Sequence, residues 1–79
     1  MAGENAYGVI LFHTNSAVLR AEKILLRESF TIRLIPVPRH LSSDCGIALR
    51  FDLQAETRIR ETLEAAGVSI DSIHALEAS

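Results

Sequence analysis

The stretch Pro36-Val-Pro-Arg-His-Leu-Ser-Ser-Asp-Cys-Gly-Ile-Ala-Leu-Arg50 decides the topology of the chain, because it separates two segments that read as strands. Two prolines in three residues fix φ at about −65° and bias the residue before each towards extended backbone. The Ser-Ser-Asp run at 42–44 offers oxygens that can hold a turn, and Gly46 permits a close approach or a positive φ. We therefore predict a braced loop that delivers Cys45 to a defined place.

Strand patterns lie on both sides of this loop. Residues 31–36 alternate Ile32 and Leu34 against Arg33, and residues 47–51 alternate in the same way, as half-buried strands do. Residues 7–12 are apolar on both faces, which predicts a buried strand in the centre of a sheet. Residues 68–76 predict a fourth strand of uncertain register, because their isoleucines and leucine are three residues apart.

Two helices are predicted between these strands. The first begins at an N-cap, Ser16 or Asn15, and runs to about Glu28. Its apolar stripe consists of Ala17, Ala21, Ile24 and Leu25. The second begins at Asp52 and ends before Gly67, with Ala55, Ile59, Leu63 and Ala66 on its inner face and a Glu56–Arg60 pair outside.

The resulting order βαββαβ predicts an α+β fold, the ferredoxin-like two-layer sandwich, with an antiparallel sheet and two helices on one face. Strands one and three are then neighbours in the middle of the sheet. The loop between strands two and three reaches the end of the sheet where strand one leads into helix one. We therefore expect Cys45 beside residues 13–16, in a single domain over residues 7–76 that follows a flexible tail, residues 1–6.

Composition limits the possible functions. The 79 residues suit one small domain, and a net charge of −2 gives no general electrostatic case for binding nucleic acid or an anionic membrane. Apolar runs fall far short of the roughly 20 residues that span a bilayer. The first residues lack a signal-peptide pattern, and a single cysteine, which cannot form an internal disulfide, is typical of a cytoplasmic protein.

The cysteine suggests the chemistry. A thiolate is the reactive form, and helix N-termini and cations favour it. An activated thiol in this place suits capture and transfer of a persulfide, selenium or a thioester. Our candidate site is therefore the acceptor Cys45 with the surrounding residues His13, Thr14, Asn15, Ser16, Arg39, His40, Ser42, Ser43 and Gly46. The alternative is that Cys45 is a small buried hydrophobic residue.

Other motifs are weaker. His13, His40 and Cys45 lack the close spacing of metal ligands, and the sequence has no Gly-rich phosphate loop or Cys-x-x-Cys motif. We therefore expect no metal and no cofactor. Arg20, Lys23 and Arg27 form a basic line on the first helix, which fits either a solvated face or an acidic partner.

The run Ile35–Phe51, with its Pro-Val-Pro-Arg and Ser-Ser-Asp-Cys-Gly segments, resembles the signature of the "Putative Se/S carrier protein-like" family. The run Phe12–Glu22 looks like the strand–turn–helix entry of that family, and the resemblance covers about residues 7–75. It implies a small carrier without turnover chemistry of its own. Cys45 would be the attachment point, and the partners would be sulfur or selenium donor and acceptor proteins.

Two rival functions stay open. One is a non-catalytic regulatory or interaction module of the same fold, which binds a small anion or a protein. The other is assembly through the open face of the sheet. Strand one is apolar on both sides, with Tyr7, Val9 and Leu11 on one and Ile10 and Phe12 on the other. An apolar set, extended by Ile35 and Ala48, would then face outward, and we expect a homodimer or a partner there.

Overall fold

The computed structural model describes residues 6–41 and 45–76 of the chain. Its elements follow the predicted order. They are β1 (Tyr7–Leu11), α1 (Asn15–Arg27), β2 (Ile32–Pro36), β3 (Ile47–Asp52), the short 3-10 turn η1 (Leu53–Ala55), α2 (Glu56–Ala65) and β4 (Ser72–Leu76). No helix among these residues is long and apolar enough to cross a membrane.

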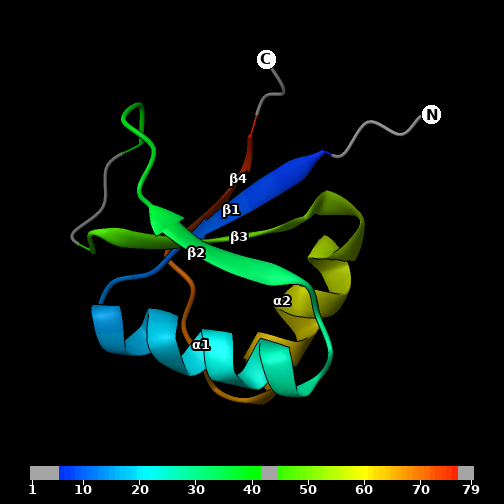
Figure 1. Cartoon of the computed structure of the whole chain (residues 1–79). Coiled ribbons are helices and arrows are strands. Elements are labelled where there is room, and N and C mark those ends of the chain that lie inside the picture. Colours follow the sequence, from blue (N-terminus) through cyan, green and yellow to red (C-terminus); the bar gives the residue numbers. More distant parts are fainter. Residues whose placement is uncertain (1–5, 42–44, 77–79) are drawn as a thin grey trace.

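The four strands form one sheet with the spatial order β2-β3-β1-β4. β3 pairs antiparallel with both β1 and β2, so β1 and β2 run parallel to each other on either side of it. β4 pairs antiparallel with β1 at the other edge. This topology confirms the ferredoxin-like α+β fold, with β1 and β3 in the centre of the sheet (Figure 1).

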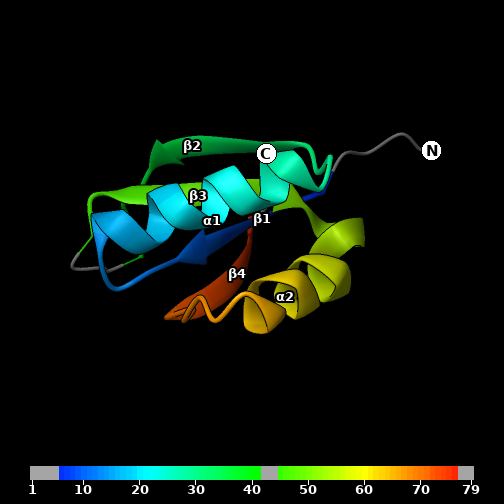
Figure 2. The same ribbon diagram turned by 90° about the horizontal axis from the view of Figure 1, so that it is seen from below.

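Both helices cover the same face of the sheet (Figure 2). The core between the two layers is apolar, and its fully buried members are Ile10, Phe12, Leu49 and Phe51 from the β1 and β3 segments and Val18, Ala21, Leu25, Ile59 and Leu63 from the helices. Burying one such large side chain contributes about 1.5–3 kcal/mol. The predicted inner faces of both helices are confirmed, with Val18 as an additional buried residue of α1.

The opposite face of the sheet has no helix, yet its centre is buried. Val9, Leu11 and Ala48 are 0%, 1% and 0% exposed. They form an open-face cluster, closed by the half-buried side chains of Ile35, Val37, Leu41 and Leu76. Val37 and Leu41 belong to the β2–β3 loop, whose described part rises on the side away from the helices (Figure 1).

This cover corrects one expectation. The strand alternation is as predicted, with Val9 and Leu11 opposite the helices, but their side chains are not an exposed apolar patch because the chain's own loop packs over them. A homodimer through this face stays a prediction, and it would have to form around Val37 and Leu41.

The start of each helix differs from the prediction. The N-cap of α1 is Thr14, not Ser16 or Asn15, and its Oγ1 accepts a hydrogen bond from the backbone N–H of Ala17 at 3.1 Å. Asp52 caps η1 rather than α2, because its carboxylate accepts from the N–H of Gln54 at 3.0 Å. The side chain of Asp52 therefore caps η1, and α2 begins after η1, at Glu56.

The helix ends include one surprise. Gly67 follows α2 with φ of 76°, as predicted for the residue after a helix. The same left-handed conformation after α1 is adopted by Ser29, with φ of 70°, where the sequence has no glycine to announce it. The Glu56–Arg60 pair is confirmed, with 2.8 Å between Oε2 and Nη2.

β4 is shorter than predicted, and its spacing has a simple explanation. Residues 68–71 form a connection and the strand occupies only Ser72–Leu76. Ile73 pairs with Ile10 and packs on the helix side, whereas Leu76 pairs with Tyr7 and packs on the open-face cluster. Ile70 packs against the helix-side core before the strand begins. Apolar residues three apart therefore serve two different faces.

Candidate functional site

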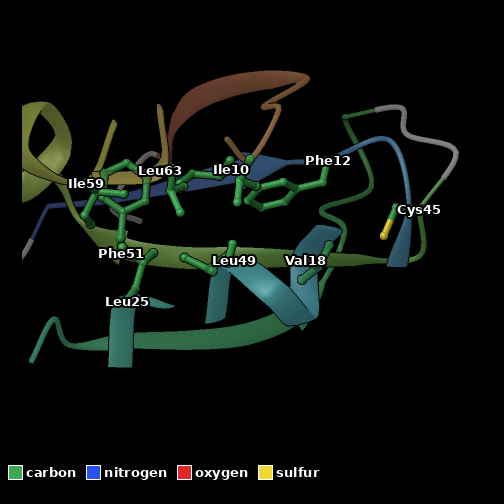
Figure 3. Close-up of a cluster of buried hydrophobic side chains, with 11 residues drawn as sticks. Ile10, Phe12, Val18, Leu25, Cys45, Leu49, Phe51, Ile59 and Leu63 are labelled. Atoms are coloured by element: carbon green, nitrogen blue, oxygen red, sulfur yellow. The ribbon is translucent and has the colours of Figure 1, made fainter. Parts of the chain in front are cut away.

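The site lies at the end of the sheet where β1 leads into α1 and the β2–β3 loop leads into β3. The thiol of Cys45 donates to Oδ1 of Asn15, with a sulfur–oxygen distance of 2.8 Å across 30 positions of sequence. Figure 3 shows Cys45 at the end of the buried cluster, with its sulfur beside the start of α1. The predicted approach of Cys45 to the first turn of α1 is confirmed at Asn15.

Cys45 itself is buried. It is 3% exposed, forms no disulfide and belongs to the helix-side core. Its sulfur also lies 3.2 Å from the backbone carbonyl oxygen of Ile47, two residues ahead in β3. Both oxygens are acceptors, so either can receive the S–H of the thiol. The sequence could not show whether Cys45 is exposed, and the structure shows that it is buried.

Asn15 can serve either form of the sulfur. Because Thr14 provides the helix cap, the side-chain amide of Asn15 is left for the thiol. An asparagine amide carries an acceptor oxygen and a donor N–H₂ group, which differ by a half-turn of the amide. The oxygen suits a thiol, and after that half-turn the N–H₂ group suits a thiolate or another anionic sulfur. Asn15 is therefore the residue best placed to follow a change in charge at Cys45.

The remaining residues of this entry segment are on the surface. The side chain of His13 is 61% exposed and lies 3.9 Å from Oδ1 of Asp71. The backbone N–H of Asp71 donates to the carbonyl of Leu11, which joins the start of β4 to the end of β1. Ser16 is exposed in the first turn of α1. Sequence reasoning missed Asp71, although β4 has to begin beside the end of β1 in this topology.

The cations of the β2–β3 loop lie on the surface. Arg39 and His40 are exposed. His40 lines a cavity of about 530 Å³ with Leu41, His74, Ala75 and Leu76, beside the open-face cluster. Cys45, in contrast, packs on the helix side. The structure therefore places His40 and Cys45 on opposite faces of the sheet.

Gly46 does not have the role that the sequence suggested. Its φ is not positive, and a Cβ built on it would meet nothing within 4 Å. Its carbonyl accepts from the N–H of Val37 at 3.3 Å, which ties the two ends of the loop together. Ser42 and Ser43, the other predicted loop residues, lie outside the described residues.

The histidines and the cysteine do not gather. Within residues 6–41 and 45–76, no group of three or more His, Cys, Asp or Glu side chains is arranged to hold a metal ion. His13 pairs with Asp71, His40 and His74 line the cavity beside the open-face cluster, and Cys45 bonds to Asn15. What the site can offer chemically is one sheltered thiol with an adaptable amide at a helix start.

Of three comparisons with known proteins, one found a match. Neither the curated proteins nor the solved structures gave a significant match to it. A family model does match, over residues 7–75, and this range includes every described element except the last residue of β4. The chain therefore belongs to the family described as "Putative Se/S carrier protein-like".

Proposed function

We propose that the protein carries sulfur or selenium as an adduct on Cys45 and passes it from a donor protein to an acceptor. The observation that carries this proposal is the position of the single cysteine. Its sulfur lies 2.8 Å from Asn15, the first residue of α1, inside the segment that matches the family model. Free N–H groups at a helix start favour a nearby anion, which a persulfide is.

The transfer step needs no external oxidant. The Cys45 thiolate attacks the outer sulfur of a donor persulfide, R–S–SH. The new S–S bond forms on Cys45 as the donor S–S bond breaks, and the donor leaves as its thiolate, R–S⁻. The proton of the Cys45 thiol goes to solvent or to the leaving thiolate, and the acceptor reverses these roles in the second transfer. A selenium atom bound to a donor sulfur would move in the same way.

The buried position suits a carrier because a persulfide terminus reacts readily with oxidants and other thiols. Cys45 at 3% exposure would hold its adduct out of bulk solvent, and the half-turn of Asn15 would present N–H₂ to the charged terminal atom. The protein would then release the adduct only when a partner opens this end of the sheet.

The rival function is an interaction module in which Cys45 is only a packing residue. The 3% exposure is the observation that favours it, since free cysteines are often buried. Intact mass separates the two after incubation with glutathione persulfide. The carrier predicts an adduct of one sulfur atom, lost in Cys45→Ser and removed by dithiothreitol. The absence of an adduct both from glutathione persulfide and from a pyridoxal-phosphate cysteine desulfurase supplied with cysteine would favour the module.

A further inference from the structure

The outer surface of α1 has an unusual composition. Leu19 and Leu26 are 50% and 53% exposed, and within the described residues they are the only large apolar side chains so exposed. They are seven positions apart on one helix, two turns along the same side. Single exposed leucines are ordinary on protein surfaces, but an aligned pair is the spacing by which a helix is bound in a partner's groove.

Cations lie along one side of this pair. Lys23 and Glu22 are both between the two leucines, on opposite sides of the line that joins them. Arg27 lies beside Lys23, and both cations border a groove of about 650 Å³ between α1 and α2, which Glu28 also lines. In the described part of the chain, neither Lys23 nor Arg27 takes part in an ion pair or side-chain hydrogen bond, whereas Arg20 donates to the carbonyl of Ala66 at 3.1 Å. α1 carries three cations and one carboxylate, Glu22, in a chain whose net charge is −2.

The surface is continuous with the candidate site. Asn15, Leu19 and Leu26 follow the i, i+4, i+11 spacing of one helix side. With a rise of 1.5 Å per residue, Leu19 lies about 6 Å and Leu26 about 16 Å along the axis from Asn15. Asn15 in turn accepts the hydrogen bond of the Cys45 thiol. Figure 2 shows no other helix or strand in front of α1 on the side turned away from the sheet.

We propose that Leu19, Lys23, Leu26 and Arg27, the α1 docking face, bind the protein that donates sulfur to Cys45. This inference rests on the carrier function proposed above. The partner surface that fits is acidic with an apolar centre. The two leucines supply apolar contact area, and Lys23 and Arg27 attract an acidic surface and so speed its association. A partner seated along this line ends at Asn15. By taking over the hydrogen bond of Asn15 it frees the Cys45 thiol for attack.

Two sulfur donors test the docking face separately from the chemistry. One is a pyridoxal-phosphate cysteine desulfurase supplied with cysteine, and the other is glutathione persulfide, which needs no protein contact. The test variant is Leu19→Gln with Leu26→Gln, since glutamine keeps helix propensity close to that of leucine. We expect loading from the desulfurase to fall by about tenfold or more, as for removal of an interface hot spot. Loading from glutathione persulfide should stay unchanged.

A charge reversal provides the matched control. Lys23→Glu and Arg33→Glu change the net charge equally, but Arg33 is an exposed residue of β2 whose partner in the sheet is Arg50 on the open face. Lys23→Glu should slow desulfurase loading several-fold, and the loss should shrink at high salt because exposed charges are screened. Arg33→Glu should load as the wild type does.

The outcomes are distinct. If neither glutathione persulfide nor the desulfurase loads Cys45, the carrier function fails. If Cys45 is loaded, two results would overturn docking at the α1 docking face. One is a desulfurase that loads the wild type no faster than glutathione persulfide does, and the other is equal loading of all variants by the desulfurase. Two further results would reassign the face: binding to anionic phosphatidylglycerol vesicles or a dimer in light scattering, either one lost in the double glutamine variant. The first would make it a membrane surface and the second a self-association surface.

Discussion

The two faces of the sheet are closed by different means. The helix face is covered by α1 and α2, and its core contains fully buried side chains from both layers. The open-face cluster has three buried residues and is closed by half-buried side chains, two of them from the β2–β3 loop. That loop then ends at Cys45, which packs into the helix-face core. The candidate site is therefore attached to the helix-face core, while the described side chains Val37 and Leu41 of the loop that leads to it pack on the smaller open-face cluster.

The first way to test this contrast is a matched pair of core substitutions. Leu49 on β3 and Leu11 on β1 are both buried, the first on the helix face and the second on the open face. We expect Leu49→Ala to lower the free energy of unfolding by about 4 kcal/mol and Leu11→Ala by about 2.5 kcal/mol, because a loop can collapse into a cavity more easily than two packed layers can. Urea denaturation measures both values. Equal or reversed losses would show that the loop is as rigid a cover as the helices.

The second test adds an atom instead of removing some. A Cβ on Gly8, in β1, would lie 2.5 Å from Cζ of Phe51 and 2.8 Å from Cδ2 of Leu53. Gly8→Ala should therefore destabilise the protein by about 1–3 kcal/mol through overpacking of the helix face. Gly46→Ala is the control, since its Cβ meets nothing within 4 Å. It should be neutral or slightly stabilising, and an equal loss at both positions would contradict the packing explanation.

The position of Gly8 also shows what the sequence could and could not predict. Alternation and helical stripes were enough for the element order, and the order was enough for the sheet topology and for the meeting of Cys45 with the first turn of α1. Those features depend on which face a residue occupies, and that is a local property of the chain. The close fit of Gly8 against Phe51 depends instead on how side chains from two strands share one space.

The errors at the site have the same physical origin. Arg39 and His40 are close to Cys45 in the sequence, and the prediction therefore placed them close to it in space. The loop instead packs Leu41 on one face and Cys45 on the other, which carries His40 away from the sulfur. By residue type, Ser16 and Asn15 are better caps than Thr14. In the structure Thr14 has the extended backbone of a cap residue, with φ of −139° and ψ of 157°, and Asn15 bonds to the thiol instead.

The third test removes one of the side chains that close the open-face cluster. Leu41→Ser removes a half-buried side chain from the loop and should lower the free energy of unfolding by about 1 kcal/mol. It also uncovers apolar surface over Val9 and Leu11, so we expect this variant to self-associate more strongly than the wild type in light scattering. A wild type that is already dimeric would instead support assembly through the open face.

The last test concerns the bond that joins the two regions, and it should hardly change stability. In the free wild type, iodoacetamide should alkylate Cys45 at least about tenfold more slowly than in the urea-unfolded chain, because a thiol at 3% exposure is not accessible. The sequence alone predicted the opposite, a thiol activated by the helix start, and burial is the reason for our revision. Asn15→Ala removes the acceptor at 2.8 Å and should raise the native alkylation rate several-fold, with a stability change of less than about 1 kcal/mol. Ser16→Ala, one residue on and exposed, is the control and should change neither quantity. If Asn15→Ala leaves the rate as slow as in the wild type, then packing of the core rather than the Asn15 amide restrains the thiol, and a partner docked along α1 would have to open the core itself to reach the sulfur.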